Sequence, residues 1–134
     1  MTTQALAGIR VLDLTRLLPG PFATQLLLHH GAEVIKVEDT GAGDYARDLK
    51  PLPGSGFGAA FTASNRGKRS VAIDLKQASG VDALLALVSE SDVLVESFRP
   101  GVMDRLGVGW ERLSAHAPAL IYCAITGYGQ RTER

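Results

Sequence analysis

The densest group of residues able to do chemistry lies just before a predicted strand near the middle of the chain. Residues 65–70 (NRGKRS) place three cations, Arg66, Lys68 and Arg69, within four residues beside a glycine. Arginine forms forked hydrogen bonds with phosphate oxygens, and lysine supplies a point charge. Glycine lets the backbone approach an anion. The segment therefore fits a phosphate-binding loop, and a solvated run of surface charges is the alternative interpretation.

The first predicted βα turn, residues 15–21 (TRLLPGP), lacks the G-x-G-x-x-G pattern of dinucleotide-binding folds. A P-loop pattern is also absent from the sequence, so these motifs argue against NAD, FAD and a Walker-type nucleotide site. Glu38 and Asp39 follow the second predicted strand, where a Rossmann fold carries its ribose-binding carboxylate. These acids could bind a ribose or an amine, or could simply be solvated.

Two further cations, Arg99 and Arg105, flank a Pro-Gly turn after the fourth predicted strand. Both fall at or just past a carboxyl strand end, where open α/β sheets bind their ligands. An ion pair between Arg105 and its neighbour Asp104 is the alternative for that arginine.

The histidines and the single cysteine do not form a metal or nucleophile pattern. His29 and His30 are adjacent, so one helix face cannot present both to a metal, and His116 stands far away in the sequence. Cys123 lies in an apolar run, which predicts a buried, inert thiol. We therefore expect no metal site and assign no catalytic residue.

The elements that must position these residues alternate between strand and helix patterns. A strand, a helix and a second strand within about 30 residues predict a right-handed βαβ unit with parallel strands. The whole pattern predicts a doubly wound α/β fold with helices on both faces of a mostly parallel sheet. The expected strands are 9–14, 33–38, 70–74, 92–96 and 120–125, and the expected helical segments are 22–30, 81–89, 102–106 and 110–116.

Residues 39–69 interrupt this alternation with a segment rich in glycine and proline. A structureless stretch of this length is unusual inside a compact domain and is commonly functional. We expect it to form a surface excursion that covers a site. No helix pattern follows the last predicted strand, so the sheet is expected to be incomplete, either truncated or completed by another chain.

Composition sets broader limits on function. The 134 residues suffice for one domain, and 14 basic residues balance 14 acidic ones. A net charge of zero gives no global signal for nucleic acid or an anionic membrane. Without a signal-peptide pattern or an apolar run of membrane-spanning length, we expect a cytoplasmic protein.

Several segments together resemble the N-terminal part of the family III CoA-transferases (CaiB/BaiF-like), which share it with 2-methylacyl-CoA racemases. The opening LAGIRVLDLTRLLPGPFATQLLLHHGAEVIKVE is followed by GAGDYAR, NRGKRSVAIDLK, DVLVESFRPGVMDRLGVGWERL and ITGYGQ, in family order and at family-like spacing. The resemblance extends from Leu6 to Gln130.

The resemblance implies that residues 1–134 form the N-terminal CoA-binding part of a Rossmann-like large domain, without the small domain and the C-terminal part. Family members continue further and interlock as homodimers. The resemblance favours the phosphate interpretation of Arg66, Lys68 and Arg69. It also implies CoA contacts at Leu17, Leu18, Pro19, Asp39, Ile73, Asp74, Leu75, Lys76, Ser97, Phe98, Arg99 and Arg105. Relatives often carry arginine where this chain has Asp39, which suggests a lost or rerouted contact with the nucleotide.

The same resemblance implies acyl-CoA and a carboxylic acid as substrates, with no permanently bound cofactor. Transfer in this family uses an aspartyl nucleophile, and racemisation uses a histidine and an aspartate. Both sets lie beyond the GYGQ segment and therefore outside this sequence. CoA transfer between carboxylic acids is the leading hypothesis, and the alternatives are racemisation, a non-catalytic CoA- or nucleotide-binding module, and a gene remnant.

Overall fold

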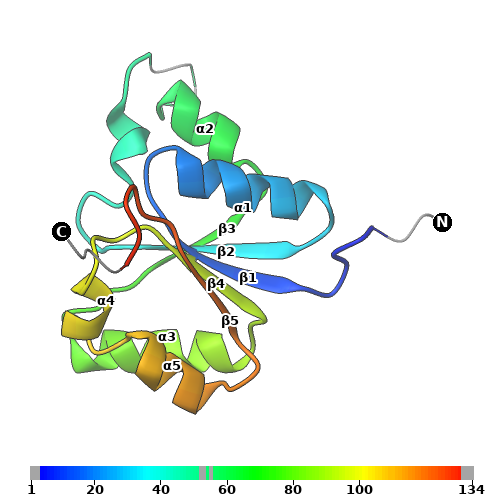
Figure 1. The fold of residues 1–134 in the computed structure, drawn as a ribbon. Helices are drawn as coiled ribbons and strands as arrows, with labels where there is room; N and C mark the ends of the chain where they lie inside the picture. Colours follow the sequence, from blue (N-terminus) through cyan, green and yellow to red (C-terminus); the bar gives the residue numbers. More distant parts are fainter. Residues whose placement is uncertain (1–3, 52–53, 55, 131–134) are drawn as a thin grey trace.

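A computed structural model describes residues 4–51, 54 and 56–130 as a five-stranded parallel sheet between two layers of helices (Figure 1). The strands are β1 (Arg10–Leu14), β2 (Glu33–Glu38), β3 (Arg69–Ala72), β4 (Val93–Glu96) and β5 (Ile121–Ala124). Their order across the sheet is β3-β2-β1-β4-β5. The order reverses direction at β1, as in doubly wound folds, and this places the expected ligand crevice between the ends of β1 and β4.

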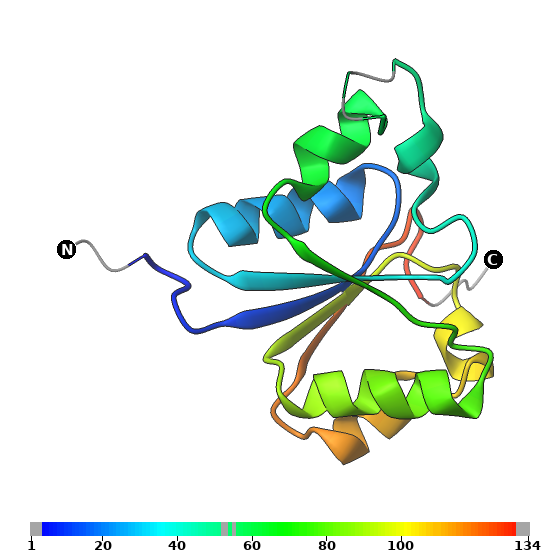
Figure 2. The same ribbon diagram turned by 180° about the vertical axis from the view of Figure 1, so that it is seen from behind.

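Helices cover both faces of the sheet, which confirms the predicted fold class (Figures 1 and 2). On one face lie α1 (Pro19–His29), the 3-10 helix η1 (Tyr45–Asp48) and α2 (Ala59–Asn65). On the other face lie α3 (Ala78–Ser89), α4 (Val102–Arg105) and α5 (Trp110–His116).

The central strands are buried on both faces because successive side chains of a strand point to opposite helix layers. Val11 packs with Val34 and Val95 in the cluster on the α1 face, while Leu12 joins the larger cluster on the α3 face. The predicted amphipathic face of α3 is confirmed, since Leu84 and Val88 are fully buried against the sheet. Parallel sheets covered on both faces show such continuous apolar strands.

Register places the carboxyl ends of four strands along one edge. Leu14 of β1 lies opposite Glu96 of β4, and Glu38 of β2 lies opposite Ala72 of β3. The segments that leave these strand ends carry most of the expected CoA contacts, so the register brings them to the same edge.

The glycine-rich segment is more structured than the sequence predicts. Its described part contains η1 and α2, so the expectation of a structureless excursion over residues 39–69 is wrong in that respect. The Asp44 side chain caps η1 by accepting a hydrogen bond from the Ala46 N–H, and Phe61 of α2 is buried. Side-chain capping and one buried aromatic residue stabilise short helices that carry no periodic pattern. Residues 52, 53 and 55 lie outside the described part.

Cys123 is exposed, and the expectation of a buried thiol is wrong. β5 is the last strand of the described sheet, and its residues alternate between sides that are covered and uncovered. Tyr122 packs against the core on the α3 face, whereas Ile121 on the opposite side is 63% exposed. An apolar sequence run therefore does not guarantee burial at a sheet edge. In the part of the chain that the structure describes, no helix combines the length and apolar character needed to cross a membrane.

The contrast between neighbouring strands gives a testable prediction. Leu94 of β4 is fully buried, so Leu94→Ala should lower the free energy of unfolding by about 2–5 kcal/mol. Ile121 of β5 is mostly exposed, so the matched change Ile121→Ala should alter it by less than about 0.5 kcal/mol. Urea denaturation followed by circular dichroism measures both. Equal losses in the two variants would show that β5 is covered in solution.

Candidate functional site

A pocket opens at the carboxyl edge of the sheet, where β1, β2, β3 and β4 end. Apolar side chains line it together with a polar group of three acids and two cations. The lining residues are Leu14, Arg16, Val37, Glu38, Asp39, Ile73, Asp74, Leu75, Lys76, Phe98 and Leu106. Its cavity of about 90 Å³ is small beside the ~300–1,000 Å³ typical of ligand sites, so it fits one end of a large ligand.

Six of the sequence-predicted contacts meet in this pocket although they come from three separate segments. Asp39 follows β2, Phe98 follows β4, and the others follow β3; these are Ile73, Asp74, Leu75 and Lys76. Ser97 lies beside them, where its Oγ accepts a hydrogen bond from the Arg16 N–H at 3.2 Å.

Arg16 is the charged pocket residue that sequence reasoning missed, and the apolar residues Leu14, Val37 and Leu106 were missed with it. Arg16 Nη2 lies 2.9 Å from Asp39 Oδ2, and its guanidinium lies over the rings of Tyr45 and Phe98. Its position directly after the β1 end was the available signal, because that is where open α/β folds place ligand contacts. The ion pair with Asp39 joins the first turn to the segment after β2.

The three predicted phosphate-binding cations do not converge on one anion site in this structure. The Lys68 side chain is 1% exposed, and its ammonium contacts Asp13, Thr24, the Pro21 carbonyl and Asn65 at 2.8–2.9 Å. Arg69, at the amino end of β3, pairs with Glu33 at 2.6 Å. Arg66 is exposed, and its carbonyl accepts a hydrogen bond from Gln25. Consecutive strand and turn residues point in different directions, so clustering in sequence did not produce clustering in space.

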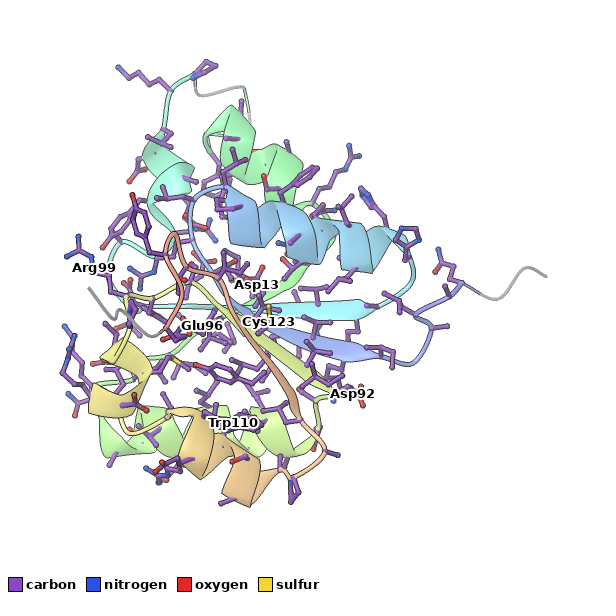
Figure 3. All side chains as sticks on the ribbon, viewed as in Figure 1. Asp13, Asp92, Glu96, Arg99, Trp110 and Cys123 are labelled. Atoms are coloured by element: carbon purple, nitrogen blue, oxygen red, sulfur yellow. The ribbon has the colours of Figure 1, made fainter. Side chains whose placement is uncertain are left out.

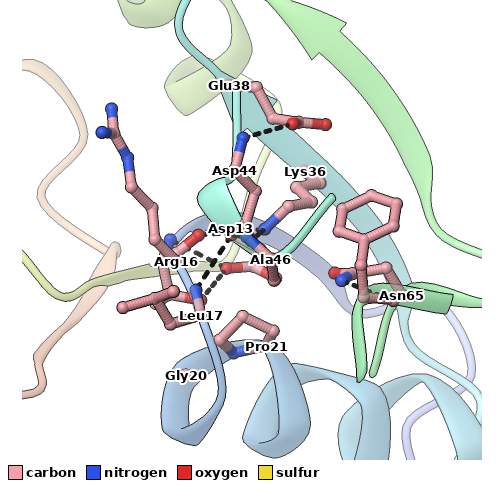
Figure 4. Close-up of polar contacts among 12 residues, drawn as sticks. Asp13, Arg16, Leu17, Gly20, Pro21, Lys36, Glu38, Asp44, Ala46 and Asn65 are labelled. Atoms are coloured by element: carbon pink, nitrogen blue, oxygen red, sulfur yellow. Dashed lines mark hydrogen bonds and ion pairs between the residues drawn. The ribbon is translucent and has the colours of Figure 1, made fainter. Parts of the chain in front are cut away.

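Two buried ion pairs lie beside the first βα turn, and the one between Lys36 and Asp44 is drawn in Figure 4. Asp13 pairs with Lys68, and Lys36 pairs with Asp44, each at 2.9 Å between side chains that are at most 1% exposed. Burial alone would raise the pKa of Asp13, but the charges of Lys68 and Lys36 outweigh it and lower that pKa. Burial lowers the pKa of Lys68, and the charge of Asp13 offsets this only in part. Such pairs are held together by geometry, since either charge alone would be costly to bury.

The remaining predicted contacts lie around the pocket. Leu17 and Leu18 are 45% and 57% exposed in the first turn, and Pro19 is the first residue of α1. Proline suits a first helical position because its missing N–H has no intrahelical acceptor there. Arg99 projects outward after β4 (Figure 3), in a neighbouring pocket with Glu96 and Tyr122. Arg105 is exposed at the end of α4.

The histidines have structural neighbours. His29 contacts the Gln25 side chain, and His116 links α5 to α3 through Ser89 and the Leu85 carbonyl. Among the described residues, no three His, Cys, Asp or Glu side chains are grouped so that they could hold a metal ion.

Glu38 and Glu96 lie at the ends of β2 and β4, the two strands that flank β1, and their electrostatic settings are opposite. Burial alone would raise the Glu38 pKa, but hydrogen bonds from Arg47, the Asp44 N–H and Ser70 lower it to about 2. Glu38 is therefore fully engaged, and Asp39 is engaged as well, since it pairs with Arg16 and accepts hydrogen bonds from the Gly41 and Gly43 N–H groups. Burial raises the pKa of Glu96, and hydrogen bonds from the Phe98 N–H and the Tyr122 hydroxyl offset this only in part.

Glu38 should make the chain sensitive to acid. Its pKa lies at about 2 in the folded chain against an ordinary value of 4.5, so its stabilising effect is complete above 4.5 and lost as the pH falls towards 2. The full difference corresponds to about 3 kcal/mol. Glu38→Gln should lower the unfolding free energy at pH 7 and flatten its dependence between pH 4.5 and 2. Urea titrations across this range test it, with the exposed Glu111→Gln as the control; an unchanged slope in Glu38→Gln would contradict it.

Glu96 should behave in the opposite way. Because its folded pKa is raised, its protonated form favours folding below 4.5, and stability is lost as the pH rises through the raised value. Glu96→Gln keeps a neutral side chain of the same shape that can bond Phe98 and Tyr122. The variant should therefore equal or exceed the unchanged chain in unfolding free energy at pH 7, measured by urea denaturation. A loss of more than about 2 kcal/mol would instead indicate a stabilising carboxylate.

Comparison with known proteins places the whole chain in one family. A model of CoA-transferase family III matches residues 6–134. The chain is 47% identical over 127 residues to mouse succinyl-CoA:glutarate CoA-transferase, and the aligned region covers 95% of this chain and 29% of that protein. It is 45% identical over 128 residues to formyl-CoA:oxalate CoA-transferase of Rhodopseudomonas palustris (strain BisB18), over 95% of this chain and 30% of the relative.

Solved structures agree. A CAIB/BAIF family protein from Brucella suis superposes with a TM-score of 0.91 at 41% identity, covering 98% of this chain and 35% of that one. The protein Rv3272 from Mycobacterium tuberculosis gives a TM-score of 0.89 at 43% identity over 96% of this chain and 35% of that one. The chain thus spans about a third or less of these relatives, and it belongs to CoA-transferase family III.

Proposed function

We propose that this chain supplies the CoA-binding part of an enzyme that transfers CoA between carboxylic acids. The observation that carries the proposal is the pocket, which gathers six of the contacts implied by the family resemblance. Its apolar floor, including Val37, Ile73 and Phe98, suits a flat nucleobase, and its polar rim suits the attached sugar and phosphates.

Cations at the same edge support an anionic ligand. Lys76 is exposed at the pocket, and Arg99 and Arg105 are exposed in the segment after β4. Arg16 lines the pocket as well, with its charge balanced by Asp39. Phosphate recognition through these side chains replaces the proposed role of Lys68, whose ammonium already has four partners inside the protein.

The chemical step is proposed to depend on an aspartyl nucleophile outside these 134 residues. In the family mechanism, that carboxylate attacks the thioester carbonyl to form an acyl anhydride and release the CoA thiolate. The thiolate attacks the aspartyl carbonyl, which forms an aspartyl thioester and releases the first carboxylate. The second carboxylate attacks this thioester to form a second anhydride, and the thiolate released then attacks the acyl carbonyl, which gives the new acyl-CoA and restores the aspartate. The part described here would hold the CoA moiety while the acyl group changes. An interlocked homodimer of the longer protein is part of the same proposal.

Racemisation of a 2-methylacyl-CoA would use the same CoA pocket, so it stays an alternative for the longer protein. The two are separated by the product. In transfer, labelled CoA moves from one acyl group to another carboxylic acid. In racemisation, the α-proton of the acyl group exchanges with deuterium from deuterated water.

CoA binding tests the proposal directly. Calorimetry on the folded chain should show CoA binding at least about tenfold tighter than NAD, because the first turn lacks the dinucleotide pattern. Dephospho-CoA, as a third ligand, reports on the 3′-phosphate. Lys76→Ala should weaken CoA binding several-fold, whereas Lys50→Ala, which removes an exposed lysine outside the pocket, should not. Equal or tighter binding of NAD would refute the proposal.

A further inference from the structure

The backbone of Leu17 adopts a conformation that leucine rarely takes. Among the residues that the structure describes, Leu17 is the one non-glycine residue with a positive φ, at 66°. A Cβ atom disfavours this left-handed region, and residues held there cluster at ligand-binding and catalytic sites. Leu17 lies in the first βα turn, directly after the pocket residue Arg16. Some other part of the molecule must hold it in place.

The buried pair of Lys36 and Asp44 forms hydrogen bonds with the turn on both sides of Arg16. Asp44 Oδ1 accepts a hydrogen bond from the Leu17 N–H at 3.0 Å, and Asp44 Oδ2 lies 2.9 Å from Lys36 Nζ. Lys36 Nζ also donates to the Thr15 carbonyl at 2.9 Å. One ion pair therefore fixes the carbonyl of residue 15 and the amide of residue 17 relative to β2 (Figure 4).

Other anchors fix the rest of the turn and leave Leu17 to this pair. Asp13 accepts a hydrogen bond from the Thr15 N–H at 2.9 Å, and Ser97 accepts one from the Arg16 N–H. The result is a turn whose consecutive amides are each bound to a side chain, while the side chains of Leu17 and Leu18 stay exposed at the ligand edge. Added stability alone does not account for this arrangement, because a buried ion pair often contributes little net free energy to folding.

We propose that Lys36 and Asp44 are positioning residues that hold Leu17 in its left-handed conformation and so preform the first turn for CoA. The proposal rests on the proposed CoA-binding function and deepens it. Without the pair, residue 17 relaxes to a negative φ, and Arg16, Leu17 and Leu18 change direction together. The ligand must then reorder the turn when it binds. Its apparent affinity falls in step with the fraction of molecules whose turn is already in the binding conformation.

The test compares two double variants with a core control. K36M/D44A removes both charges and the acceptor of the Leu17 N–H without leaving an unpaired buried charge. K36M/D44N removes the charges but restores an amide oxygen at position 44. Val88→Ala makes a cavity in α3, where Val88 is fully buried and remote from the turn. Two readouts are measured on each chain, the hydrogen exchange of the Leu17 amide by NMR and the CoA dissociation constant by calorimetry.

K36M/D44A should speed Leu17 amide exchange and weaken CoA binding, each by about tenfold. K36M/D44N should recover most of the amide protection, and Val88→Ala should leave CoA affinity unchanged. In a Leu17→Gly background, where a positive φ carries no strain, the effect of K36M/D44A on CoA affinity should shrink to about twofold.

Unchanged Leu17 exchange in K36M/D44A, or equal losses in Val88→Ala, would overturn the positioning role. If the unchanged chain fails to bind CoA, the proposed function fails, and Leu17 exchange still decides whether the pair holds the turn. If K36M/D44A does not fold, the K36M/D44N variant decides. A small but measurable loss of Leu17 protection together with weaker CoA binding and a native core supports the positioning role, and full protection together with undiminished CoA affinity refutes it.

Discussion

Two buried ion pairs, Asp13–Lys68 and Lys36–Asp44, are the interaction on which the rest of the structure depends. Their four members come from β1, from β2, from the segment after β2 and from the residues just before β3. Burying a lone charge costs several kcal/mol, so each member requires its partner to stay in place. The pairs thereby fix four segments around the first βα turn, and that turn borders the pocket.

The ligand edge follows from this arrangement together with the parallel register. Strand ends carry Glu38 and Glu96 into the same region, and within residues 4–51, 54 and 56–130 Glu38 alone of the two pairs with a cation, Arg47. Arg47 therefore neutralises Glu38 on the β2 side of the pocket, and the region after β4 keeps a carboxyl group with a raised pKa in the same pocket as exposed Arg99. An open polar rim over an apolar floor is what a nucleotide-bearing ligand requires.

Order and type of the main elements were predictable because strand and helix periods differ. The five strands, α1, α3 and the two short C-terminal helices appear close to their expected positions. Boundaries shifted where local chemistry decides, as at Pro19, which begins α1 three residues before the periodic pattern does. The short helix α2 was missed because seven residues with one large apolar side chain, Phe61, carry no recognisable period.

The sequence by itself determined the fold class, the absence of a dinucleotide motif and the resemblance to CoA-transferase family III, since these depend on local patterns and their order. Tertiary structure alone decided which side chains meet. Lys68 lies inside the protein because Asp13, 55 residues earlier, faces it, and Cys123 is exposed because β5 ends the described sheet. The strained Leu17 and its anchor Asp44 are likewise 27 residues apart. Residue types and spacing fix local geometry, but contacts across such distances depend on how the layers pack.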